Sequence, residues 1–101
     1  MSNEILKTPG ELADELLKIS YQASKCGEEL GTILKDKAKI WLTIRTMPQI
    51  KSDKQADRYW DNSERGSREI ELRYQIKSLE FKISAIKTKI NVLNNEAHNQ
   101  Y

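Results

Sequence analysis

The 101-residue sequence has little of what disulfide-rich, loop-rich or membrane-spanning proteins need. Its one cysteine, Cys26, excludes an internal disulfide, and two prolines and four glycines are too few for an all-β or loop-rich fold. No apolar run approaches the roughly 18 residues of a transmembrane helix, and the amino terminus has no secretory signal pattern. We therefore expect a cytoplasmic protein with no membrane partner.

The sequence also lacks a group of side chains that would carry catalysis or bind a metal ion. His98 is the only histidine, and it stands in a polar tail without neighbours for general-base chemistry. Cys26 has apolar neighbours at helical spacing and no cation on its face to stabilise a thiolate. The acids show neither the D-x-D nor the E-x-x-H spacing of metal sites. We expect no enzyme, no catalytic or metal-binding residue and no cofactor.

Charge is plentiful but nearly balanced, and it is unevenly distributed along the chain. Charged residues make up 32% and hydrophobic residues 38%, which suits long solvated helices with narrow apolar stripes. The net charge of +2 excludes an acidic DNA mimic and is low for a dedicated DNA-binding protein. Residues 1–30 carry six acids and three bases, whereas residues 31–101 carry fourteen bases and nine acids. Such asymmetry indicates either a surface for an acidic partner or simply a solvated helix face.

Two apolar seams with heptad spacing dominate the sequence. In each, apolar residues recur in alternating steps of four and three, as in coiled-coil helices. The later seam consists of Leu72, Ile76, Leu79, Ile83, Ile86, Ile90, Leu93 and Ala97. The earlier seam, interrupted only by a lysine, consists of Leu12, Leu16, Ile19, Ala23, Cys26, Leu30, Ile33, Lys37, Ile40, Ile44 and Met47.

Capping signals set the expected helix boundaries. Thr8, Pro9 and Glu11 form a capping box with a proline at the first helical position. Pro48 ends this first helix, and its seam keeps phase across Gly27 and Gly31, so we expect one continuous helix. The domain is predicted to be one helical unit over residues 1–101, with helices at about 9–47, 53–64 and 68–97, and with residues 1–7 and 98–101 disordered.

Weaker signals describe the connector between the two long helices. Ser52 with Gln55 forms a second capping box, and the short helix after it would turn Ala56, Tyr59 and Trp60 inward. Gly66 is expected to break the helical pattern, and Ser67 to cap the last helix.

Two long helices with a capped connector predict an all-α fold, a long antiparallel helical hairpin with a short connecting helix. One seam is a thin core for a chain of this size, and further apolar stripes include Leu34, Ala38, Trp41, Tyr74 and Phe81. We therefore expect a homo-oligomeric helical bundle. The sequence leaves open whether each seam packs within the chain or against another copy. The predicted oligomer interface comprises Leu34, Trp41, Tyr74, Phe81, Ile83, Ile86 and Ile90.

The hairpin would bring basic residues together at one end, where they could contact phosphates. The alternative is that they only keep the bundle soluble. The tryptophans and Tyr59 could stack on bases if exposed, or they are core aromatics. The candidate residues for binding nucleic acid or an acidic partner are Lys35, Lys37, Lys39, Arg45, Lys51, Lys54, Arg73 and Lys77.

Residues 69–90, EIELRYQIKSLEFKISAIKTKI, resemble small helical accessory proteins of tailed bacteriophages, with a fainter echo in TPGELA at residues 8–13. Such proteins often act near DNA replication and recombination, or against host defences. The resemblance implies a class of role, in the host cytoplasm, and transfers no functional residue.

The function expected from these patterns is that of a non-enzymatic phage-type accessory protein, whose basic end engages nucleic acid or a DNA-processing partner. The alternative is a counter-defence inhibitor, anti-CRISPR-like or anti-signalling, that binds a host defence protein or its nucleotide messenger. A purely structural scaffold is the third hypothesis.

Overall fold

The computed structural model describes residues 7–99, and the side chains of residues 7–96. Within that range every regular element is a helix: α1 (Pro9–Arg45), α2 (Asp53–Asn62) and α3 (Glu64–Asn99). The all-α expectation is confirmed. No helix between residues 7 and 99 has the length and apolarity needed to cross a membrane.

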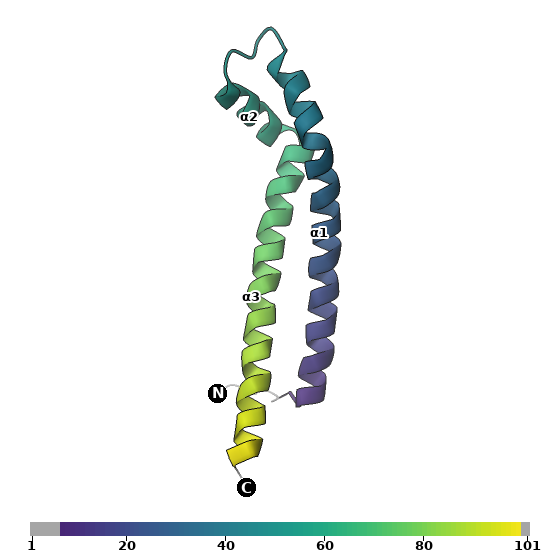
Figure 1. Cartoon of the computed structure of the whole chain (residues 1–101), viewed down its shortest axis with the longest axis vertical. Coiled ribbons are helices and arrows are strands. Elements are labelled where there is room, and N and C mark those ends of the chain that lie inside the picture. The colour runs from purple at the N-terminus through teal and green to yellow at the C-terminus, as the bar shows by residue number, and fades with distance from the viewer. Residues whose placement is uncertain (1–6, 100–101) are drawn as a thin grey trace, which may run out of the picture.

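The two long helices lie side by side and run in opposite directions, while α2 packs against both near one end (Figure 1). The result is a rod of 72 × 30 × 19 Å. We call the end that contains α2, formed by residues 31–77, the closed end. The open end is formed by residues 7–30 and 78–99, and it contains the start of α1 and the end of α3 (Figure 1).

Helix α1 begins as its capping signals predict. The Thr8 hydroxyl oxygen accepts a hydrogen bond from the Glu11 backbone N–H at 3.2 Å, and Pro9 occupies the first helical position. The helix passes through both glycines without a break, as expected. It ends at Arg45 rather than residue 47, because Pro48 disfavours helical geometry at the residue before it.

The junction of α2 and α3 differs from the prediction. Helix α3 starts at Glu64, not at residue 68, and Ser63 alone separates it from α2. The Ser63 hydroxyl accepts from the Gly66 backbone N–H at 3.1 Å, and its carbonyl accepts from the Ser67 N–H at 2.9 Å. Ser63 therefore caps α3, and the expectation that Ser67 does so was wrong.

Gly66 does not break the helix but allows a close approach inside it. A Cβ atom at this position would lie only 1.7 Å from the carbonyl oxygen of Trp60. Glycine is therefore required because the end of α2 presses against the first turn of α3. At its other end α3 runs to Asn99, so residues 98 and 99 are helical and were wrongly expected to be disordered. Residues 1–6 and 100–101, which were also predicted to be disordered, lie outside the described range.

The core consists of two clusters along the interface of α1 and α3. The larger lies at the closed end, where Trp60 (1% exposed) and Leu72 are fully buried, each worth about 1.5–3 kcal/mol by burial. The smaller lies at the open end and is centred on Leu12, Ile19 and Ile86. Every seam residue of residues 12–47 and 72–93 is buried or half-buried. The two seams therefore pack against each other within the chain, while the side chain of Ala97 lies outside the described set.

Candidate interaction surfaces

A buried polar network joins the three helices at the closed end. Glu69 of α3 is 7% exposed. Its Oε1 atom accepts from Trp60 Nε1 of α2 and binds Lys37 Nζ of α1, both at 2.9 Å. Its Oε2 atom accepts from Arg73 Nε at 2.9 Å, and the Lys37 ammonium also lies 5.6 Å from the Trp60 ring centre. One carboxylate thus receives a donor from each helix.

The environment keeps Glu69 ionised. Burial raises the pKa of its carboxyl, but the hydrogen bonds from Lys37, Trp60 and Arg73 outweigh burial and lower the pKa to about 2. A group that stays charged and fully paired at neutral pH suits a structural clamp better than a proton donor or acceptor. Two of the predicted binding residues, Lys37 and Arg73, are occupied in this clamp.

The remaining predicted cations fall into two groups. Arg45 pairs with Asp53 at 2.9 Å and is not free. The other five make no ion pair with any residue in the described part of the chain. These unpaired lysines are Lys35, Lys39, Lys51, Lys54 and Lys77.

The two stretches of sequence that define the ends of the rod differ in net charge. The closed end has eleven basic and seven acidic residues, a net charge of +4. The described residues of the open end have six basic and seven acidic residues, a net charge of −1. This division is not level across the rod, because Glu29 and Cys26 of α1 lie beside Arg68 and Gln75 of α3, so the basic end stays a prediction.

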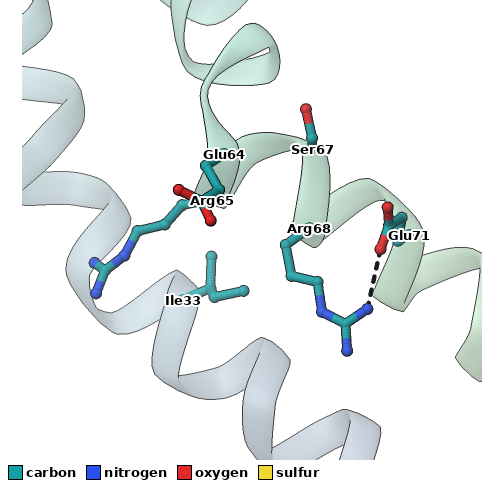
Figure 2. Close-up of a pocket in the computed structure, with 6 residues that line it drawn as sticks. All are labelled: Ile33, Glu64, Arg65, Ser67, Arg68 and Glu71. Carbon is teal, nitrogen blue, oxygen red and sulfur yellow. Dashed lines mark hydrogen bonds and ion pairs between the residues drawn. The ribbon is translucent and has the colours of Figure 1, made fainter.

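An open depression of about 620 Å³ lies where α3 starts beside α1 (Figure 2). Ile33 projects from α1 between Arg65 and Arg68 of α3 (Figure 2). Arg68 binds Glu71 at 3.0 Å and makes a two-pronged contact with Glu29, and the hydrogen bond from Arg68 lowers the pKa of Glu29. Because Arg65 is likewise paired with an α1 acid, Asp36, the depression offers no free cation.

The two tryptophans differ in their exposure. Trp60 is in the core, and Trp41 is half-buried with its Nε1 donating to Asp57 at 2.8 Å. Tyr59, expected to point inward, is 45% exposed instead. Tyr74 and Phe81 are exposed on the outer face of α3, as the sequence predicts.

Some residues of the predicted oligomer interface are buried within the chain and others are exposed. Ile83, Ile86 and Ile90 pack against α1 in the open-end cluster, so the structure uses them inside the chain and not at an outer surface. Leu34 remains 37% exposed beside the seam, with Trp41 half-buried one heptad further along α1.

The residues considered for chemistry show no reactive arrangement. Cys26 is half-buried, with its Sγ atom 3.5 Å from Gln75 Oε1 across the seam. Among the described residues no three acids, histidines or cysteines are placed to hold a metal ion. The side chain of His98 lies outside the described set.

No protein-family model matches this chain, and comparisons with curated proteins and with solved structures found no match. The structure alone therefore defines the class: an all-α rod with a buried polar clamp near one end and exposed aromatic side chains on α3.

Proposed function

We propose that this chain is a non-enzymatic binding protein, a hairpin that assembles into an oligomeric helical bundle and binds nucleic acid with its closed end. The observation that carries the proposal is the set of five unpaired lysines at that end, defined above. They come from all three helices and from the loop before α2, and Lys77 lies nearer the middle of the rod, since its neighbour Gln75 contacts Cys26 of α1.

Four of the seven acids of the closed end are held in ion pairs, while Asp57, Asp61 and Glu64 have none among the described residues. Asp36, Asp53, Glu69 and Glu71 are already held in ion pairs with arginines or with Lys37. These ion pairs neutralise bases as well as acids, so they do not raise the net charge of this end. A positive surface of this kind attracts a polyanion from solution before any specific contact forms.

The lysines favour binding to the phosphate backbone over reading of base sequence. Lysine is a point charge on a flexible stem, and Trp60 is buried while the indole N–H of half-buried Trp41 is held by Asp57. We expect weak, sequence-independent affinity that falls steeply with salt. Contact of five lysines with duplex DNA would give a slope of log K against log salt of about −4 to −5.

Fluorescence anisotropy with labelled single- and double-stranded oligonucleotides tests the proposal. Replacing Lys39, Lys51 and Lys54 with glutamine should weaken binding and reduce the salt slope by about 2 to 3. The matched control replaces Lys18, Lys82 and Lys87, which are exposed, unpaired within the described residues and outside the closed end.

The two triple variants lose the same charge, so they separate location from total charge. Equal losses of affinity in the two triple variants would show that net charge alone drives association, which would contradict a closed-end site. Failure of the unaltered protein to bind any oligonucleotide at about 50 mM salt, where phosphate contacts are strongest, would remove the proposal.

A further inference from the structure

Helix α1 has a second uncharged face next to its seam, which α3 does not cover. Its centre consists of the exposed residues Ser20, Ser24, Gly27 and Gly31. Ala13 and Leu17 extend it toward the open end, and Leu34 and Ala38 toward the closed end. These eight positions keep the steps of four and three, none is charged, and Leu17 is 70% exposed. We call them the flank face.

The other flank of the α1 seam is quite different, because it carries charges of both signs and two of its acids bind α3. There Glu29 binds Arg68, and Asp36 binds Arg65 at 3.2 Å, which ties α1 to α3. Such charges beside a seam set the register of paired helices. The flank face has no charge with which to do this, so it has no comparable role in holding α3.

The two glycines of the flank face have no explanation within the single chain. A glycine inside a helix costs about 1 kcal/mol relative to alanine. Gly27 and Gly31 have no positive φ, and a Cβ atom on either would meet nothing within 4 Å. Gly66, in contrast, is required by the Trp60 carbonyl. Glycine on a helix surface lets another backbone come close, and no described residue of this chain does so at Gly27 or Gly31.

We propose that the flank face packs against the same face of a second copy, with the two α1 helices antiparallel about a two-fold axis between Ser24 and Gly27. The order of residue sizes along the face supports this occupant. Read from either end, the face runs alanine, leucine, two small residues, then two small residues, leucine, alanine. A two-fold interface must be self-complementary in this way. Each Leu17 would meet Leu34 of the second copy.

Charge complementarity supports the same register. Asp14 and Lys35 lie in one row beside the flank face, three heptads apart, and neither has an ion pair among the described residues. In the antiparallel pair, Asp14 of each copy lies beside Lys35 of the other. Within one helix the same residues are about 31 Å apart, so they cannot meet in a single chain.

This pairing rests on the oligomeric part of the proposed function and names its surface, but it does not depend on nucleic-acid binding. It would put the two closed ends at opposite poles of the dimer. The flank face is about 38 Å long, which places a contact of one helix pair at the low end of stable interfaces. We therefore expect a reversible dimer with a dissociation constant in the micromolar range.

Analytical ultracentrifugation of the full chain, over concentrations from roughly 1 to 500 µM, tests the proposal. Asp14→Lys and Lys35→Asp should each weaken dimerisation about tenfold, since each places like charges together twice per dimer. The double variant should recover the original dissociation constant. Recovery of the dissociation constant would identify an intermolecular ion pair. The register would be overturned if neither single variant weakened the dimer, or if the double variant dimerised no more tightly than the single variants.

Placing a bulky residue in the flank face gives a second test of the pairing. Gly27→Gln should raise the melting temperature of the dilute monomer, because glutamine favours helix and nothing crowds the site. The same change should weaken the dimer at least tenfold, because it blocks the close approach. A folded variant that still dimerises normally would overturn the proposal.

Tyr74→Ser with Phe81→Ser distinguishes this surface from oligomerisation as such. The double variant should leave the dimer intact. If it abolishes the dimer while Gly27→Gln does not, the chain is oligomeric but the flank face is the wrong surface. A monomer at every concentration would overturn both the flank-face pairing and the proposed assembly.

Discussion

Lys37 and Glu69 occupy seam positions in α1 and α3, where the neighbouring seam residues are apolar, and they meet at 2.9 Å. Glu69 stands three residues before Leu72, which is one step of the seam spacing. The single charged interruption in each seam is therefore matched by the interruption in the other. An unpaired charge at either position would be costly at a buried interface, so the pair fixes which parts of the two helices lie together.

Removing the charge of Glu69 should destabilise the protein. Glu69→Gln keeps an acceptor for Trp60 but leaves Lys37 and Arg73 without their carboxylate, and we expect a loss of about 2 kcal/mol or more in the free energy of unfolding. Urea denaturation measures it. Glu80 is an exposed acid of the same helix with no ion pair among the described residues, so Glu80→Gln is the control and should change stability by less than about 0.5 kcal/mol.

The two partners should be energetically coupled. Lys37→Leu combined with Glu69→Gln is expected to cost less than the sum of the two single changes, because each single change leaves the other residue unpaired. Strictly additive losses in a double-mutant cycle would argue against the clamp.

Acid should weaken the protein through the same residue. The pKa of Glu69 falls from its ordinary 4.5 to about 2 in the folded protein, so its stabilising effect is full above pH 4.5 and is lost as the pH falls toward 2. The shift corresponds to at most about 3 kcal/mol. Glu15 and Glu29, whose pKa values are lowered by ion partners, act with the same sign.

Denaturation midpoints measured between pH 2 and 6 should therefore decline on acidification, and the decline should be shallower for Glu69→Gln. The same slope in both proteins would mean that Glu69 does not titrate as the structure indicates.

Alanine substitution should have opposite effects at two helical glycines. Gly66→Ala places a methyl group against the Trp60 carbonyl and should destabilise the α2–α3 junction by about 2 kcal/mol or more. Gly27→Ala meets open space and should stabilise the dilute chain by up to about 1 kcal/mol. Thermal melts followed by circular dichroism give both signs, and a stable Gly66→Ala variant would contradict the close contact.

The exposed aromatics should contribute little to the stability of the single chain. Tyr74 and Phe81 are 73% and 72% exposed, so replacing both with serine removes little buried apolar area. We expect a change within about 0.5 kcal/mol in dilute solution. A larger loss would show that this face is covered even in the monomer.

The helices could be predicted from the sequence because their signals are local. Seam spacing identified which face of each long helix is buried, and Thr8 and Ser52 marked two helix starts. The start of α3 was misplaced because the role of Gly66 depends on the Trp60 carbonyl, which another helix brings to it. Local sequence shows a glycine as a helix breaker and cannot show what approaches it.

The surfaces were less predictable, since ion pairs depend on the register between helices. Nothing in the local sequence assigns Arg45 to Asp53 or Lys37 to Glu69, so not all paired and unpaired cations could be separated, although the i, i+4 spacing of Glu69 and Arg73 is a local signal for that pair. Glu69 had a signal that was missed: the later seam extends back to it in phase. Oligomer formation, nucleic-acid binding and the resemblance to phage accessory proteins stay predictions.

The antiparallel pairing of two α1 helices is tested most directly by distances between spin labels in the dimer. With Cys26→Ala as background, a label at Lys18→Cys should give a separation between copies of about 23 Å along the rod, and one at Thr43→Cys about 53 Å. The inequality follows from a two-fold axis near residue 25. Equal short distances would indicate parallel helices, and the absence of any defined distance at high concentration would contradict the pairing altogether.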